Sequence, residues 1–505
     1  KRLARVNMLP PGHNNFLPAF ACSARACLPV CVLLLVSLYL EICSWSALHF
    51  FFRWPCQKRG CTNANGFLWL NRAGVARKQC GRVAARSLGK PQASRNNSKN
   101  LLRRLVLAPN STVLLAELHG SLTAPYFGAE HLAAALYKLA KLSSEQHPDS
   151  ASTMHRNIKL VLRAENFWRE KDVPAQALIQ LMWGAVTLRK EFPALLMWLP
   201  SLAKMAKPKV EQLRPQELSD ALWSTLFMYG EIVQFQELLH PLAEQALSKL
   251  YEMNIEQLSI LWAVVARFQR VEVYLTRYVP LLISATERSV DSMSVVALVR
   301  IMRCAASMRQ DTPEVLRLVP LLVDSCLRHV VLFGAYDLSV VIWAMGELDA
   351  RGSKTALLLQ SMRGTIIRSF NAHAFTPQHI SGLLSGLAEL GEADARVLDA
   401  ATAELVTAVP SWADRDALRL PRVVCAFARL DFYSQRLLHI VATRLLNILP
   451  LLDTESFWVL SWSYKQLDRA GSFASFQTCL RVESVRRSLE RPAVDPPNSR
   501  PAHMC

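Results

Sequence analysis

The chain has 505 residues, of which 51% are apolar and 19% are charged, with 18 glycines and 26 prolines. So many apolar side chains can bury a large core, which excludes a chain that is disordered over its whole length. The net charge of +18 and the pI of about 9.6 are typical of a nucleic-acid-binding protein, provided that the charge lies on the folded part.

The positive charge lies almost entirely in the first 116 residues. These residues include 17 Lys and Arg side chains and one acidic residue, Glu41, which gives a net charge of +16. Residues 117–505 include 41 basic and 39 acidic residues, which gives +2. The overall charge is therefore no evidence that the larger part of the chain binds phosphate.

Residues 1–116 have the composition of a targeting leader. Residues 28–40 form an apolar run of 13 residues, which is short for a membrane span and typical of the core of a signal sequence. Residues 42–116 contain no acidic side chain but many Arg and Ser residues, as organellar transit peptides do. We predict a mostly disordered basic leader that directs the protein to the mitochondrion, or to the plastid if the apolar run begins a two-part leader.

Three other interpretations of this leader stay open. The apolar segment 28–52 is compatible with a membrane anchor, and it is the part through which we predict any membrane association. The basic stretch also fits a plain disordered tail. Because Met8 is the first methionine, the beginning of the chain is also compatible with residues encoded upstream of the natural start codon.

A segment with one pattern of apolar and small residues recurs about every 40 residues between positions 130 and 468. The position four residues before the end of each segment is small in eight successive copies, whereas the earliest copy has Lys138. This indicates that a neighbouring helix crosses there, because a larger side chain would hold the two backbones apart. The small residues are Gly184, Ser224, Ala263, Cys304, Ala344, Gly386, Ala426 and Ser463.

Around this position the apolar residues are spaced by three, four and seven, which makes one stripe of an α-helix; Leu338, Val341 and Met345 are an example. Second amphipathic segments lie between the copies, and residues suited to N-caps precede several helices. The segments are 237–251, 313–330, 356–370 and 434–449, and the caps are Ser353, Thr376, Asp394 and Asp453. No segment alternates with a period of two for long enough to form a sheet.

A hairpin of two helices with about 40 residues cannot bury both of its faces alone, so such hairpins stack. The sequence therefore predicts an all-α fold: an α-α superhelix (solenoid) of about nine helical hairpins of roughly 40 residues over 130–468. Residues 469–505 are predicted to add one C-terminal helix and a loose, Pro-rich tail.

Two fragments, LSVVIWAMGEL at 338–348 and FTPQHISGLLSGLAELG at 375–391, resemble the LSxxLWAxAxLG helix of a group of organellar helical-repeat proteins. The group includes the octotricopeptide repeats of green algae, the heptatricopeptide repeats of apicomplexan parasites and the helical-repeat subunit of the kinetoplastid RNA-editing substrate-binding complex. The resemblance implies an organellar RNA-binding protein. Many relatives end in a RAP domain, and none is found after Asp468, so nuclease-like activity has no support.

No catalytic or metal-binding motif stands out, so we predict that the chain is not an enzyme and uses no cofactor or metal. The cysteines lack the C-x2-C spacing of zinc sites, and the sequence has no GxSxG, HExxH or P-loop motif. His373 and His379 straddle a turn, and Asp414 and Asp416 lie in a charged segment between helices, where a solvated turn is the simpler interpretation.

Two features are candidates for contact with RNA. Five tryptophans beside the small residues fit base-stacking platforms, although we favour a place in the core between repeats; they are Trp183, Trp223, Trp262, Trp343 and Trp462. Two positions seven residues apart, opposite the core stripe, vary between copies as in a reader of one base per repeat, but an ordinary solvent face varies in the same way. They hold Gln180, Asp220, Ser259, Arg300, Val340, Gly382, Arg422 and Val459, and Thr187, Phe227, Ala266, Ser307, Glu347, Glu389, Arg429 and Gln466.

We therefore predict an organellar RNA-binding helical-repeat protein that acts in RNA processing, stability, editing or ribosome assembly. Its partners would be single-stranded organellar RNA, ribonucleoprotein subunits or both, and the candidate RNA contacts are Arg300, Arg303, Arg422 and Arg429. The alternative is an armadillo- or HEAT-like scaffold that binds proteins, or a structural subunit of a mitochondrial ribosome or another organellar complex. The near-neutral charge of residues 117–505 favours this alternative.

Overall fold

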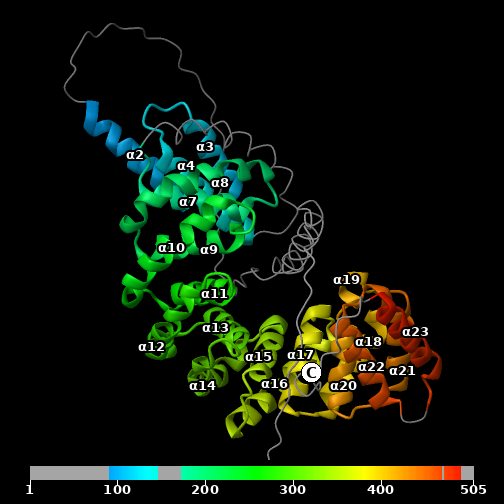
Figure 1. Ribbon diagram of the computed structural model, residues 1–505. Coiled ribbons are helices and arrows are strands. Elements are labelled where there is room, and N and C mark those ends of the chain that lie inside the picture. Colours follow the sequence, from blue (N-terminus) through cyan, green and yellow to red (C-terminus); the bar gives the residue numbers. More distant parts are fainter. Residues whose placement is uncertain (1–89, 146–171, 469–470, 491–505) are drawn as a thin grey trace, which may run out of the picture. The chain divides into compact units, whose positions relative to one another are not determined.

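The computed structural model describes residues 90–145, 172–468 and 471–490 (Figure 1). All regular elements in these residues are helices, and no strand occurs among them, which confirms the predicted all-α class. The apolar segment 28–52 and the tail after residue 490 lie outside the described residues. The described residues 90–140, 172–468 and 471–490 belong to one compact unit. The other, residues 1–82 and 141–147, lies outside the described residues except for the end of α4 (Ala129–Glu145).

Helices alternate along the chain between two sets, called here first and second helices. The first helices contain the recurring segment; they are α4, α7 (Ala175–Leu188), α9 (Pro215–Met228), α11 (Ile255–Phe268), α13 (Val295–Met308), α15 (Ala335–Glu347), α17 (Pro377–Leu390), α20 (Leu420–Arg429) and α22 (Thr454–Leu467). The second helices are α8 (Leu199–Ala206), α10 (Val233–Ser248), α12 (Val279–Ser289), α14 (Val319–His329), α16 (Ser353–Asn371), α18 (Ala395–Ala408), α21 (Gln435–Leu446) and α23 (Ala474–Glu490). The short α19 (Asp414–Ala417) precedes α20.

Short 3₁₀ helices extend many second helices at one end or the other. Those that precede or follow a second helix are η3 (Pro193–Trp198), η4 (Lys207–Gln212), η5 (Leu250–Glu252), η6 (Val273–Tyr278), η7 (Val290–Ser292), η8 (Pro313–Leu318), η9 (Val330–Leu332), η10 (Val409–Ser411) and η11 (Leu449–Leu451). All four second segments predicted from the sequence coincide with these helices, with ends that differ by a few residues.

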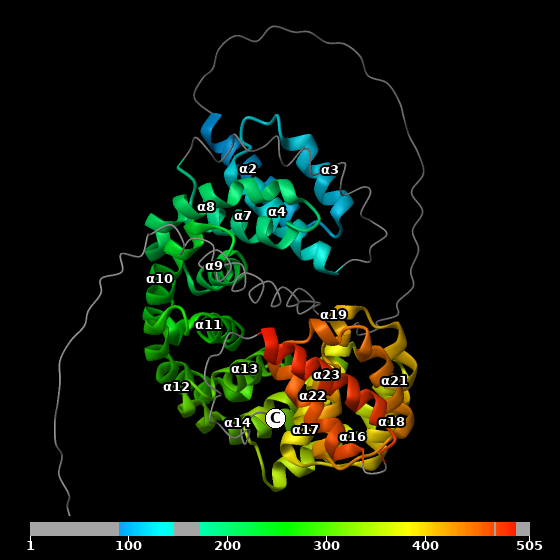
Figure 2. The same ribbon diagram turned by 45° about the vertical axis from the view of Figure 1, so that its right-hand side comes forward.

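The two sets form two layers. From α7 to α22 each first helix packs against the next first helix, and α8 against α10, α14 against α16, α16 against α18 and α18 against α21. Figure 2 shows α8, α10, α12 and α14 on one side and α7, α9, α11 and α13 on the other. Neighbours in the chain are thus neighbours in space, as the 40-residue period requires.

The core lies between the layers. Trp262 of α11 is fully buried, and its indole N–H donates a 2.9 Å hydrogen bond to Oγ1 of Thr286 on α12. In the last pair the hydroxyl of Tyr464 donates a 2.8 Å hydrogen bond to the carbonyl oxygen of Leu438. These buried donors both find acceptors on the second helix, so the indole N–H of Trp262 and the hydroxyl of Tyr464 are satisfied.

The small residues lie where one first helix crosses the previous one. A Cβ on Gly184 would lie 2.8 Å from Cγ of Leu136 on α4, and one on Gly386 would lie 2.7 Å from Cα of Trp343 on α15. The buried hydroxyls of Ser224 and Ser463 donate to carbonyl oxygens four residues earlier, at 2.8 and 2.7 Å, so they add no unsatisfied donor.

The third copy is shifted by one residue from the predicted register. In α9, α11 and α13 the N-caps are Arg214, Asn254 and Ser294, and the small position lies ten residues after the cap. In α11 this position is Val264, not Ala263, and Val264 is fully buried. The prediction for Ala263, and with it those for Ser259 and Ala266, is therefore wrong by one residue; the corresponding residues are Val264, Ile260 and Arg267.

Three of the four predicted caps have the expected geometry. Thr376, Asp394 and Asp453 each accept a hydrogen bond from a backbone N–H of the first turn that follows. Ser353 is instead the first residue of α16, and the preceding Gly352 occupies the cap with φ of 141°. Such a positive φ strains any residue with a side chain, so glycine takes the place of a side-chain cap there.

Helices begin inside the segment that the sequence assigns to the leader. α2 (Lys90–Leu107) and α3 (Ser111–Ser121) both start before residue 116. Leu101, Leu105 and Leu114 are fully buried, which explains why this part folds in spite of its leader-like lack of acidic residues.

Candidate functional site

The first helices have one face that points away from the second helices. In α15 the fully buried Leu338, Val341 and Met345 form the core stripe, and Trp343 and Glu347 lie about half a turn away from it. We call the side chains at these positions in successive first helices the outer stripe. It comprises Tyr137, Gln180, Trp183, Thr187, Asp220, Trp223, Phe227, Ile260, Ala263, Arg267, Arg300, Arg303, Ser307, Val340, Trp343, Glu347, Gly382, Ser385, Glu389, Arg422, Cys425, Arg429, Val459, Trp462 and Gln466.

Aromatic rings occupy the outer stripe from α4 to α9. The ring centroids of Tyr137 and Trp183 lie 4.6 Å apart, those of Trp183 and Trp223 lie 5.7 Å apart, and those of Trp223 and Phe227 lie 4.6 Å apart. All four side chains are half-buried, so each ring keeps part of its surface open to solvent. The guanidinium of Arg189 lies 5.3 Å from the centroid of Phe227. This aromatic run thus connects three helices that are far apart in sequence.

Hydrogen bonds hold the polar groups beside this aromatic run. The Tyr137 hydroxyl donates to Oδ2 of Asp220 at 3.2 Å, and Nε2 of Gln216 donates to Oδ1 of the same carboxylate at 3.0 Å. Burial, followed by the charge of Asp220, raises the pKa of Tyr137, so its hydroxyl stays protonated as a donor. Both carboxylate oxygens of Asp220 therefore accept hydrogen bonds, and one of these bonds fixes the ring of Tyr137.

Three arginines follow the aromatic run on α11 and α13. Arg267 lies at the end of α11, and Arg300 and Arg303 lie on neighbouring turns of α13, the helix that packs against α11. Burial and the positive charge of Arg303 together lower the pKa of Arg267, which indicates that like charges are gathered here. We call these three residues the arginine cluster.

Hydroxyl groups position two of the three side chains of the arginine cluster, Arg300 and Arg303. Nη1 of Arg300 donates to Oγ of Ser259 at 2.6 Å, and Arg303 donates to the hydroxyl of Tyr336 on α15. Burial raises the pKa of Tyr336 to about 12, so this phenol is neutral near pH 7 and leaves the guanidinium charge intact. A fixed guanidinium is suited to phosphate, which it binds through two parallel hydrogen bonds.

The outer stripe from α15 to α20 has mixed charge. Arg429 forms a bidentate ion pair with Glu389, in which Nη2 lies 2.9 Å from Oε2. Burial, followed by the negative charge of Glu389, raises the pKa of Glu347, and Arg422 lies close enough to oppose this shift. In this part of the stripe an ion pair therefore joins α17 and α20.

The four arginines predicted from the sequence fall into two groups. Arg300 and Arg303 lie together, with Arg267, in the arginine cluster. Arg422 and Arg429 lie on α20 within the mixed part, and Arg429 is engaged by Glu389. Sequence reasoning missed Arg267 because the register of α11 was shifted by one residue. The N-cap Asn254, ten residues before Val264, is the signal that would have found it.

The five tryptophans do not share one environment. Trp262 is in the core, as predicted, because the shifted register of α11 places it on the core stripe. Trp183, Trp223 and Trp343 are half-buried between neighbouring first helices, and Trp462 is 39% exposed. The expectation of a core position is thus wrong for Trp462, because no first helix follows α22 among the described residues.

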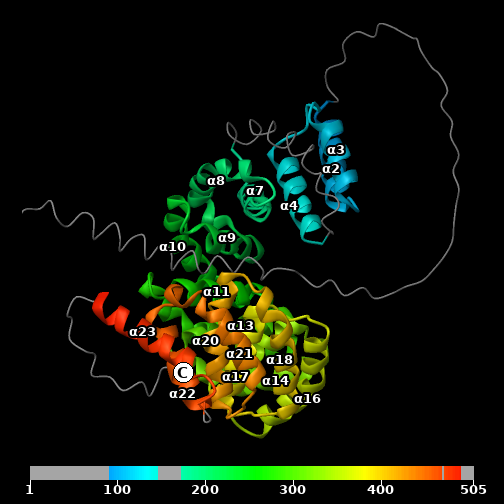
Figure 3. The ribbon, with the colours of Figure 1, turned by 90° about the vertical axis from the view of Figure 1, so that its right-hand side faces the viewer.

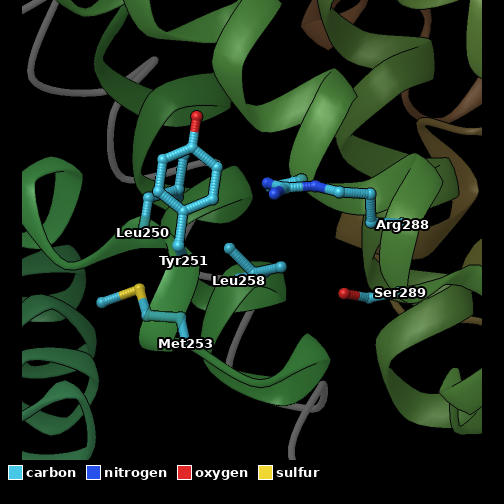
Figure 4. A pocket seen from close by; sticks show the side chains of 7 residues that line it. Leu250, Tyr251, Met253, Leu258, Arg288 and Ser289 are labelled. Atoms are coloured by element: carbon cyan, nitrogen blue, oxygen red, sulfur yellow. The ribbon is translucent and has the colours of Figure 1, made fainter.

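Three other places were candidates for a functional site: a surface hollow, the acidic segment at Asp414, and any cluster of metal-ligating side chains. A hollow of about 130 Å³ between η5 and α12 is lined by Tyr251 and Arg288, whose guanidinium lies 4.3 Å from the ring centroid (Figure 4). Asp414 binds Arg444 at 2.6 Å and begins α19, so it lies in a short helix and not in the predicted loop. No group of His, Cys, Asp and Glu among the described residues is arranged to hold a metal ion.

Within residues 90–145, 172–468 and 471–490, no helix combines the length and the apolar character that a membrane crossing needs. Comparison of the sequence with models of known protein families gives no match, and comparison with curated proteins gives none.

Proposed function

We propose that this chain binds single-stranded RNA along its outer stripe and that its helical hairpins stack into a solenoid that presents this stripe. The packing of each first helix from α7 to α22 against the next supports the solenoid. The close approach of neighbouring first helices at Gly184 and Gly386 supports it as well, because the same kind of crossing occurs at two places along the chain.

The observation that carries the proposal is the aromatic run beside the arginine cluster. Single-stranded nucleic acids bind where bases stack on aromatic rings and phosphates meet fixed basic groups. Half-buried rings such as Trp183 and Trp223 are held in place by their neighbours, so they lose little entropy when a base stacks on them. The arginines gather positive charge at one place within residues 117–505, whose net charge is only +2.

The resemblance to organellar repeat proteins extends this proposal to RNA processing, stability, editing or ribosome assembly in the mitochondrion. The absence of acidic residues from 42–116 supports targeting to an organelle. Most of the residues from which this targeting is inferred lie outside the described part of the chain.

The test is the affinity of the full chain for a fluorescently labelled single-stranded RNA pool, measured by anisotropy. Trp183→Ala with Trp223→Ala should weaken binding by at least tenfold, since stacking on one aromatic ring is worth about 1–3 kcal/mol per base. The matched control is Met197→Ala with Tyr251→Ala, which removes two exposed apolar side chains outside the outer stripe and should leave affinity unchanged.

A protein-binding scaffold is the second candidate, and the mixed charge of the outer stripe from α15 to α20, with the Arg429–Glu389 ion pair between α20 and α17, favours it for that part of the chain. Wild-type protein that binds no RNA above the background of an unrelated basic protein would reject RNA binding. Recovery of the same protein partners by wild type and by the Trp183→Ala, Trp223→Ala variant would then support the scaffold.

A further inference from the structure

The last first helix, α22, exposes a face that is buried in every comparable first helix before it. The residue five positions after the N-cap faces the next first helix, and it is at most 5% exposed in six of the earlier copies. These residues are Ile179, Ser219, Ser259, Val299, Ser339 and Ser381. At the same position of α22 stands Trp458, which is 53% exposed. The earlier first helices thus have a small or aliphatic residue at this position, covered by the next first helix. In α22 the position holds a tryptophan, and no described helix covers it.

Trp462 lies one turn further along the same face. Its counterparts Trp183, Trp223 and Trp343 are half-buried against the following first helix, whereas Trp462 is exposed. α22 lies beside α20 and α23 (Figure 3). Val482 and Val485 of α23 are also exposed. Two large exposed tryptophans on one helix face are typical of a protein interface and unusual for a solvated helix.

The charges on this face identify its occupant. Glu455 and Lys465 are exposed near the two ends of α22, and the small Ser461 lies between the two tryptophans. If two copies of α22 pack antiparallel about a two-fold axis near residue 460, Trp458 of one copy meets Trp462 of the other. The same axis places Glu455 of one copy opposite Lys465 of the other, twice per dimer. The face is therefore complementary to itself in both shape and charge, as an isologous interface requires.

We propose that the chain forms a two-fold symmetric dimer in which the α22 faces of two copies pack antiparallel, with Trp458 against Trp462 and Glu455 against Lys465. In this dimer, α22 of the second copy covers the face of α22 that, in the earlier first helices, is covered by the next first helix. It joins two rows of hairpins end to end, so that two outer stripes belong to one particle. This proposal does not rest on RNA binding, because it is argued from the exposure of Trp458 and Trp462 and from the charges of Glu455 and Lys465; Trp462 belongs to the outer stripe as well.

The test is sedimentation velocity of the full chain over a range of concentrations. Wild type should sediment as a monomer–dimer equilibrium, and Trp458→Ala with Trp462→Ala should raise the dimer dissociation constant by at least about a hundredfold. Both tryptophans are exposed, so this variant should keep the helical content and melting temperature of wild type. Met197→Ala with Tyr251→Ala, the matched control, should dimerise as wild type does.

Charge reversal tests the antiparallel arrangement directly. Glu455→Lys alone and Lys465→Glu alone should each weaken the dimer about tenfold or more, since like charges then face each other twice per dimer. The double variant Glu455→Lys, Lys465→Glu should dimerise about as well as wild type, because both pairs are restored with the signs exchanged. A monomeric wild type, a dimer that survives loss of both tryptophans, or single reversals without effect would overturn the proposal.

Discussion

Gly346 on α15 and Gly386 on α17 bring two helices so close together that a Cβ on Gly346 would lie 2.9 Å from Cα of Gly386. A Cβ on Gly386 would in turn lie 2.6 Å from the carbonyl carbon of Ile342. Both neighbours are backbone atoms, which cannot move aside as the end of a side chain can. Among the described glycines at a helix crossing, Gly386 has the closest approach to backbone atoms of the neighbouring helix.

Gly386→Ala should therefore lower the free energy of unfolding by about 1–3 kcal/mol, because the added methyl group forces the helices apart. The matched control is Gly382→Ala in the same helix, where the nearest atom to an added Cβ is Cβ of Trp343 at 3.8 Å. This control should be neutral or stabilising by up to about 1 kcal/mol, since alanine favours a helix over glycine. Urea denaturation of both variants measures the difference, and equal effects would contradict the close crossing.

The ion pair between Arg429 and Glu389 should contribute to stability and not to RNA affinity. Its two side chains are 26% and 31% exposed, so screening by solvent is incomplete, and a double-mutant cycle should give a coupling of about 1 kcal/mol. The cycle uses Arg429→Gln, Glu389→Gln and the double variant in urea denaturation. A coupling near zero, or a large loss of RNA affinity on Arg429→Gln alone, would contradict the structural role assigned to this arginine.

Acid should destabilise the protein through His379. Burial lowers the pKa of His379 from its ordinary 6.5 to about 4. Between these values the unfolded chain binds a proton that the folded chain does not. This contribution to stability is therefore complete above pH 6.5 and declines as the pH falls toward 4. His379→Gln keeps an acceptor for the backbone N–H of Thr376 and removes the titration. Its free energy of unfolding should fall less than that of wild type between pH 7 and pH 5; parallel curves would contradict the buried neutral histidine.

Trp262→Phe should lower the free energy of unfolding by more than the loss of buried apolar area alone predicts. The substitution leaves Oγ1 of Thr286 buried without its 2.9 Å donor, which costs about 1–3 kcal/mol in addition to a small cavity. Trp262→Phe combined with Thr286→Val should recover part of this loss, because the unsatisfied hydroxyl is removed with the donor. Thermal unfolding of the two variants measures the recovery, and additive losses would contradict the hydrogen bond.

The helices and their crossings could be predicted because their causes are local. A period near 3.6 residues and a small side chain at most crossings are both visible in the sequence, as at Gly184 and Gly386. The register of α11 was missed because Ala263 and Val264 are both compatible with the pattern of apolar residues. The cap at Asn254 settles the choice, because the crossing position lies ten residues after the N-cap in the neighbouring first helices α9 and α13.

The candidate site was harder to predict, because it depends on how far neighbouring helices slide past each other. The contact of Tyr137 with Trp183 joins residues from two repeats, and the sequence does not give the offset between their helices. The same limit applies to Arg267, which belongs beside Arg303 only after packing. The start of α2 was missed because the composition of residues 90–116 is that of a leader, although Leu101 and Leu105 are core residues.

The account depends most on RNA phosphates meeting the arginine cluster, and the salt dependence of RNA affinity tests this directly. For a single strand the slope of log affinity against log salt concentration changes by about 0.7 for each phosphate contact. Arg267→Gln, Arg300→Gln and Arg303→Gln together should reduce the slope of the full chain by about 2 if each arginine makes one contact. The control Arg288→Gln, Arg368→Gln and Arg396→Gln removes the same charge from exposed positions on second helices and should leave the slope unchanged. Equal slopes for both triple variants would show that the arginine cluster does not bind phosphate.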